Sequence, residues 1–184
     1  MNKIIAALLV ATSTLTIASN ANAETSFRPY VGVDYNYNNN EHFNYNSGTI
    51  NVGTQYNDYF GTEVFYQQSD DDVKSFSASP EQVTTSFDAY GLDLMGYLPM
   101  GCEQEYALIG SLGIGEYTFD KSFNWTGYDN TNDHGIGYRF GVGGLYNIDE
   151  NVALRAMVRY IKFNQIENFD EMMEYTAGIR YNFW

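Results

Sequence analysis

Several residue types that define other classes of protein are scarce in this sequence of 184 residues. Cys102 is the only cysteine, so no disulfide can form within the chain. Proline occurs three times, and no run of 18 apolar residues follows residue 23, which excludes a transmembrane helix there. Basic residues are also few, because 9 Lys and Arg stand against 23 Asp and Glu, for a formal net charge of −14. We therefore expect no nucleic-acid partner.

The first residues of the chain have the features of a secretory signal peptide. Lys3 supplies a positive charge, residues 4–10 are apolar, and Ala21 and Ala23 form an A-x-A cleavage site. We therefore expect residues 1–23 to be removed and residues 24–184 to form one domain. No cysteine follows the cleavage site, so we expect no lipoprotein anchor. Cys102 is expected to be a lone thiol, although a disulfide between two chains is the alternative.

Alternation of apolar and polar residues recurs along almost the whole chain and predicts an all-β fold. The eight predicted strands lie near residues 29–37, 49–56, 59–68, 87–98, 105–117, 135–147, 151–162 and 172–183. The short connections are 57–58, 99–104 and 148–150, and the long ones are 38–48, 69–86, 118–134 and 163–171. Short turns at one end and long polar loops at the other predict an up-and-down antiparallel barrel.

The two faces of the predicted strands differ in composition. One face carries Val, Leu and Ile between two girdles of aromatic residues and has no charged residue within the strands. The other face holds most of the strand glycines and a balanced set of four acids and four arginines. These are Asp34, Glu63, Asp93, Glu174, Arg139, Arg155, Arg159 and Arg180. Glycine weakens a strand and is unusual on a solvated face, so we predict that the polar face is a cramped interior and that the apolar face meets lipid. A soluble barrel in which the tyrosines are ordinary strand formers is the alternative.

The chain resembles the small eight-stranded outer-membrane β-barrel family, which includes the OmpA-like transmembrane domain, OmpX and the opacity-type surface proteins. The residues that carry the resemblance are "PYVGVDY", "LGIGEY" and "GIRYNF", in the first, fifth and last predicted strands. The resemblance implies an eight-stranded antiparallel up-and-down transmembrane β-barrel in a Gram-negative outer membrane, with a periplasmic amino terminus. It also implies insertion by the barrel-assembly machinery, with Tyr181, Phe183 and Trp184 as the assembly signal.

The charged interior set has two interpretations. It could form a proton or ion pathway, but we favour an interior plug that fixes the strand register. A lipid-modifying enzyme is the main alternative function, since some small barrels have such activity. It would need a nucleophile beside a histidine, and only His42 and His134 are available, with Ser47 and Ser122 in the same kind of predicted loop.

The predicted function is therefore non-enzymatic. We expect a structural or surface-interaction protein whose long acidic external loops contact host or surface ligands, with outer-membrane lipids around the barrel. A narrow pore is a less favoured alternative. We expect a monomer and no cofactor. The acidic loops at 69–74 and 129–134 could bind a divalent cation, but they lack the spacing of an EF-hand, so we favour solvated loops and expect no metal.

Overall fold

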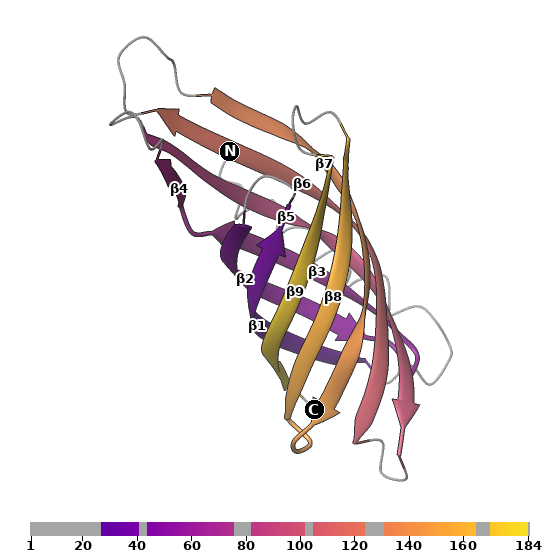
Figure 1. Cartoon of the computed structure of the whole chain (residues 1–184). Coiled ribbons are helices and arrows are strands. Elements are labelled where there is room, and N and C mark those ends of the chain that lie inside the picture. The colour runs from indigo at the N-terminus through magenta and orange to yellow at the C-terminus, as the bar shows by residue number, and fades with distance from the viewer. Residues whose placement is uncertain are drawn as a thin grey trace.

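The computed structural model describes residues 27–40, 44–75, 82–101, 105–123, 131–164 and 170–183. These residues form an all-β fold of nine strands (Figure 1). The strands are β1 (Arg28–Asn39), β2 (Asn44–Gln55), β3 (Phe60–Ser69), β4 (Asp72–Ser75), β5 (Gln82–Met100), β6 (Tyr106–Phe123), β7 (Thr131–Asn147), β8 (Val152–Asn164) and β9 (Glu171–Asn182). Within this part of the chain, no helix is long and apolar enough to cross a membrane.

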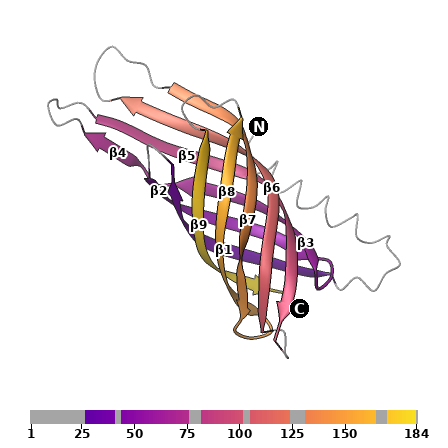
Figure 2. The same cartoon turned by 45° about the vertical axis from the view of Figure 1, so that its right-hand side comes forward.

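Antiparallel pairing closes the sheet into a barrel. Strands β1 to β3 pair in sequence order, as do β5 to β9, while β1 pairs with β9 and β3 pairs with β5. Figure 2 shows the result, with β6–β9 crossing in front of β1–β3. The short β4 pairs only with the first residues of β5 and lies outside the ring. The prediction of an eight-stranded up-and-down barrel is therefore confirmed.

Polar side chains stabilise two of the short turns that connect the strands. The backbone N–H groups of Tyr59 and Phe60 both donate to the Asn57 side chain, at 2.8 Å. Asp149 accepts in the same way from the N–H groups of Asn151 and Val152, at 2.8 and 2.7 Å. These side chains compete well for backbone donors, which is why Asn and Asp favour tight turns. The turns at 56–59 and 148–151 define the turn end of the barrel.

The opposite end, here called the loop end, differs from the prediction. The long polar connections at 38–48 and 118–134 are largely strand, since β2 begins at Asn44 and β6 continues to Phe123. In Figure 1, β5, β6 and β7 run past the other strands at this end. Alternation failed as a signal at 38–48 because both faces of β1 and β2 are polar near the loop end: Asn39 and Asn46 point outward, and the inward Asn38 donates to the Ser47 Oγ at 2.7 Å.

The outward face of the strands is apolar and exposed. Val142 is 68% exposed, and Val33 and Ile179 are similarly accessible. On each of the eight strands that form the barrel wall, the apolar surface ends toward the loop end at one polar residue. These residues form the polar ring: Asn39, Asn46, Gln68, Asp88, Glu116, His134, Lys162 and Glu171. Between the polar ring and the turn end, the outward positions of the described strands carry no charge.

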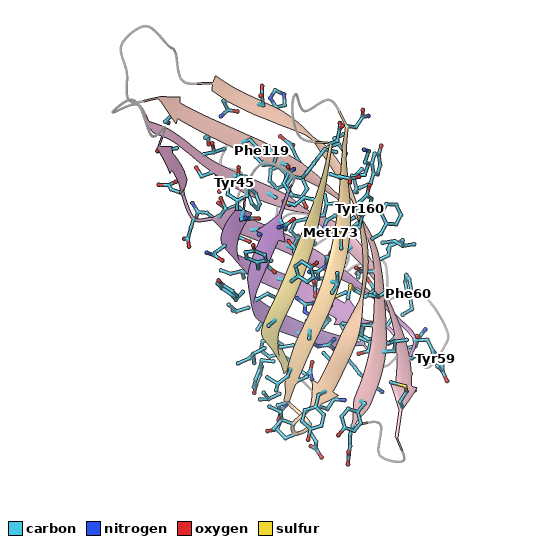
Figure 3. The ribbon with its side chains drawn as sticks, viewed as in Figure 1. Tyr45, Tyr59, Phe60, Phe119, Tyr160 and Met173 are labelled. Atoms are coloured by element: carbon cyan, nitrogen blue, oxygen red, sulfur yellow. The ribbon has the colours of Figure 1, made fainter. Side chains whose placement is uncertain are left out.

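The inward face is layered rather than uniformly polar. A loop-end cluster consists of Tyr45, Phe65, Phe87, Ala89, Tyr117, Phe119, Ile161, Phe163 and Met172. A turn-end cluster consists of Met95, Tyr97, Ala107, Ile109, Leu145, Ala153 and Met157. Figure 3 places Tyr45 and Phe119 toward the loop end, and Tyr59 and Phe60 toward the other. The interior therefore contains two apolar clusters that the expectation of a polar interior did not include.

Candidate functional site

The charged layer of the interior is the candidate functional site. Alternation along the strands points Asp34, Glu63, Asp93, Arg139, Arg155, Arg159 and Glu174 inward from β1, β3, β5, β7, β8 and β9. All seven are buried, and Glu63 and Asp93 are 1% and 0% exposed. Ion pairs connect them in two groups, and together they are called the central network below.

Arg155 organises the first group. Its Nη2 donates to Asp34 and its Nη1 donates to the Glu63 Oε2, the latter at 2.6 Å. Asp34 also accepts from the Asn51 amide at 2.8 Å, and Glu63 accepts from the Tyr30 hydroxyl at 3.0 Å. One guanidinium therefore holds two carboxylates from strands β1 and β3, and each carboxylate has a second donor.

Glu174 organises the second group. It accepts from the Arg159 Nη1 at 2.9 Å, the Arg139 Nη2 at 3.3 Å and the Gln67 amide at 2.7 Å. The Arg139 Cζ also lies over the Phe65 ring, 3.6 Å from its centroid, which is a cation–π contact. Charged hydrogen bonds and ring stacking therefore fix the layer against the loop-end cluster.

Asp93 is bound less closely than the other three acids. The Arg139 Nε lies 3.6 Å from its Oδ1, and neither carboxylate oxygen has a hydrogen-bond partner among the described residues. Its carboxylate lies against Gly113 on β6, where a Cβ would overlap it. Gly178 accommodates the Asp34 carboxylate in the same way. At these two positions glycine makes room for an acid.

Arg180 is the one predicted interior charge that the structure places apart from this layer. It lies near the turn end, where its guanidinium stacks 3.6 Å over the Tyr30 ring. It donates to the Asn182, Gln55 and Tyr97 side chains at 2.6, 3.1 and 3.2 Å. The Tyr97 hydroxyl lies 3.3 Å from the Tyr30 hydroxyl, which donates to Glu63, so two tyrosines connect Arg180 to the first group.

The sequence analysis did not identify the aromatic and other apolar residues that fill the interior toward its two ends. Phe87, Phe119 and Phe163 pack at centroid distances of 5.5 and 5.7 Å in the loop-end cluster. Tyr97 and Met157 belong to the turn-end cluster. Alternation along the strands could have identified them. These residues fall on the same face as the inward charges, where apolar side chains do not contact lipid and must pack against one another.

Tyrosine side chains mark the boundary between the apolar surface and the polar ring. Tyr35 donates to Asn46 at 2.7 Å, Tyr66 to Asp88 at 3.3 Å, Tyr90 to Glu116, and Tyr160 to Glu171 at 2.6 Å. Each tyrosine reaches a member of the polar ring on the next strand. The aromatic ring lies on the apolar surface and the hydroxyl bonds a polar side chain, which is the arrangement that tyrosine adopts at a membrane interface.

The structure separates the residues considered for catalysis. Ser47 points into the interior, where the Gln67 and Asn38 side chains donate to it at 2.8 and 2.7 Å, so its predicted place in an external loop was wrong. His134 belongs to the outward polar ring, and Ser122 is exposed near the tip of β6. His42 lies outside the described residues.

Other predicted sites fall partly outside the described chain. Cys102, the cleavage residues Ala21 and Ala23, and Trp184 are among the undescribed residues, so those predictions stay predictions. Tyr181 and Phe183 point outward at the turn end, with ring centroids 5.1 Å apart. No group of three or more metal-ligating His, Cys, Asp or Glu side chains occurs in the described part of the chain.

Comparisons with known proteins agree with this architecture. The sequence model of the family described as "Outer membrane protein beta-barrel domain" matches residues 5–183. Neisserial surface protein A is 17% identical, with 85% of this chain and 97% of that chain aligned and a TM-score of 0.66. Ail, the attachment invasion locus protein of Yersinia pestis, is 16% identical over 88% and 100% of the chains, with a TM-score of 0.58.

The amino-terminal β-barrel domain of Pseudomonas aeruginosa OprF is also similar. It is 16% identical over 84% of this chain and 97% of that chain, with a TM-score of 0.57. At these identities the likeness to solved structures shows the fold alone. The comparison with curated proteins found no match.

Proposed function

The chain belongs to the family of outer-membrane protein β-barrel domains, and from this premise we propose that it is a non-enzymatic surface protein whose loop end contacts its partners. Family membership implies the outer membrane of a Gram-negative bacterium. The observation that carries the proposal is the division of each strand into an exposed apolar face and a filled interior. The apolar face suits contact with outer-membrane lipids, and the filled interior leaves little room for transport. The projecting ends of β5–β7 remain as the accessible surface.

The orientation that we propose places the loop end outside the cell and the amino terminus in the periplasm. The support is the asymmetry between the ends: the turn end has short turns bonded by Asn57 and Asp149, whereas β5, β6 and β7 run past the other strands at the loop end. Outer-membrane barrels have short periplasmic turns and longer extracellular loops.

A protease site inserted in intact cells tests this orientation. We expect cleavage when the site is inserted at 124–130 and protection when it is inserted at 148–150. Permeabilised cells, in which both insertions should be cut, are the control. The reverse pattern in intact cells would contradict the orientation.

The charge of the loop end supports a cationic surface ligand. Asp70, Asp71, Asp120 and Asp170 are exposed there. Ail has been crystallised with the heparin analogue sucrose octasulfate, which is a polyanion. An acidic surface repels a polyanion, so we propose that this chain differs from Ail and prefers positively charged ligands.

Binding of intact cells to immobilised polylysine and to heparin tests this preference. Cells that carry the protein should bind polylysine more than cells without it, and the difference should decrease as salt increases. Replacing Asp70 and Asp71 with Asn should reduce the difference. A gain in heparin binding instead would contradict the proposed ligand class.

Assembly by the barrel-insertion machinery rests on the outward aromatic residues of β9 and its end. Phe183 continues the outward row of Tyr175, Ile179 and Tyr181. We expect deletion of Trp184 to be mild, and deletion of Phe183 and Trp184 together to reduce the folded, heat-modifiable fraction in outer-membrane preparations sharply. Normal assembly of the double deletion would show that these residues are not a signal.

The alternative functions have less support. For a lipid-modifying enzyme, the buried position of Ser47 and the outward position of His134 do not provide a nucleophile beside a base. For a narrow pore, a conducting path would have to pass both apolar clusters and the central network. We likewise propose a monomer, since the eight strands of the barrel wall form a closed sheet with no open edge that would need a partner strand.

A further inference from the structure

A groove lies on the outward face of β1, β2 and β3, at the level of the polar ring. Its volume is about 560 Å³, which is within the usual range of small-ligand sites, about 300–1,000 Å³. The strand register explains its floor, because Gly48 lies between Tyr35 on β1 and Gln68 on β3 in one outward row. Gly48 has no side chain, so this row is interrupted at its centre.

Packing within the described chain does not require glycine at position 48. A Cβ at Gly48 would meet no atom within 4 Å, whereas a Cβ at Gly113 or Gly178 would overlap a carboxylate. Glycine weakens a strand, and it often marks a place where a ligand approaches the backbone closely. A molecule outside the chain therefore explains Gly48 better than contacts inside the barrel do.

The groove has an apolar end and an acidic end. Toward the turn end it is lined by Val33 and Ile50, which are 61% and 57% exposed, and by Tyr66. Toward the loop end it is lined by Asp70 and Asp71, which are both exposed. The Asp70 N–H donates to a backbone carbonyl of β2 at 2.8 Å, which holds the acidic end beside that strand. Among the described residues that line the groove, none is basic.

We propose that this groove binds a small cationic amphiphile that reaches the barrel from outside the cell. Its alkyl chain lies against Val33 and Ile50 over Gly48, and its ammonium group lies beside Asp70 and Asp71. The apolar surface removes the alkyl chain from water, and the two carboxylates attract the cation. The inference rests on the proposed function, which places the loop end outside and assigns it cationic ligands, and it adds an apolar contact that a hydrophilic polycation does not make.

A second outward groove provides an internal control. It has a volume of about 680 Å³ and lies on β6–β9 around Gly144, beside Tyr146, Leu154 and Ile179. A Cβ at Gly144 would also have space, since the nearest atom is 4.0 Å away. None of the described residues that line this second groove is acidic. It therefore offers a surface for the alkyl chain but no partner for the cation.

Equilibrium dialysis of radiolabelled dodecylammonium tests the proposal, with the barrel folded in phosphatidylcholine vesicles. Relative to vesicles without protein, the barrel should add a saturable component of about one amphiphile per barrel. This component should decrease as salt increases. Dodecanol, which has the same alkyl chain without the charge, should show no such component. Absence of the component with dodecylammonium, or an equal component with dodecanol, would overturn the proposal.

Matched variants locate the binding site. Gly48→Leu fills the groove and should abolish the saturable component, whereas Gly144→Leu fills the second groove and should leave it unchanged. Replacing Asp70 and Asp71 together with Asn should weaken the component without affecting the fold, because both side chains are exposed. Heat-modifiable migration verifies that each variant is folded. Equal effects of the two leucine variants, or full binding by the asparagine variant, would contradict the assignment.

Polylysine binding by intact cells separates this inference from the proposed function. Cells that carry Gly48→Leu should bind polylysine as well as cells with the unmodified protein, because the acidic end of the groove remains. Polylysine binding without the saturable amphiphile component would overturn the groove as a site and leave the proposed function intact. The saturable component without polylysine binding would support the groove and contradict the proposed ligand class of the loop end.

Discussion

The outward and inward faces of the barrel are built from alternate residues of the same strands, yet they follow different rules. The outward face needs only to be apolar over a height that matches the hydrocarbon core of the bilayer. Many different apolar residues satisfy that requirement between the polar ring and the turn end. The inward face is specific, because Arg155 must meet two particular carboxylates and Gly178 must leave space for one of them. The comparison teaches that the outward face determines where the chain can reside, whereas the inward face determines which barrel it forms.

Removing Arg155 should be the most destructive single change to the inward face. Arg155→Ala leaves the Asp34 and Glu63 carboxylates buried without their shared cation, and we expect a loss of about 3–5 kcal/mol in the free energy of unfolding. Urea unfolding in detergent micelles measures it.

The matched control is Arg28→Ala. Arg28 forms an exposed ion pair with Asp58 at 3.1 Å, and such pairs contribute about 0–1 kcal/mol. Equal effects of the two substitutions would show that the inward layer is not specific.

A charge on the outward face should have the next largest effect. Val142 lies in the middle of the outward row of β7, and Val142→Arg should cost about 2–4 kcal/mol when the barrel is folded in lipid vesicles. His134→Arg, in the polar ring of the same strand, should change the stability by at most about 1 kcal/mol because it lies beyond the apolar surface. If both variants were equally stable, the outward face would not lie in hydrocarbon.

A single hydrogen bond of the central network should contribute less. Tyr30→Phe removes the donor to Glu63 but leaves the Arg155 hydrogen bond at 2.6 Å. We expect a loss of about 1.5–3 kcal/mol, the usual contribution of a hydrogen bond to a charged group. Urea unfolding is again the measurement, and Tyr59→Phe, at an exposed position in a turn, is the control. A Tyr30→Phe barrel as stable as the control would place Tyr30 outside the network.

Much of the fold could be predicted from the sequence because the outward face repeats a simple pattern. Alternation located all eight strands of the barrel wall, and the inward charges were identified from their alternate positions along these strands. The strand ends at Asn44 and Phe123 were missed, since pairing there depends on contacts between side chains from different strands, such as Asn38 with Ser47. The surroundings of Arg180 were missed for the same reason: the hydroxyl groups of Tyr97 and Tyr30 connect it to Glu63, and no local pattern encodes that arrangement.

The contrast between a lipid-facing exterior and a filled interior is tested most directly by electrical recording. The purified barrel, inserted into planar lipid bilayers, should insert stably and show no steady conductance, because the central network and the two apolar clusters occupy the lumen. A reproducible open conductance of the intact chain would contradict this account and would favour the pore.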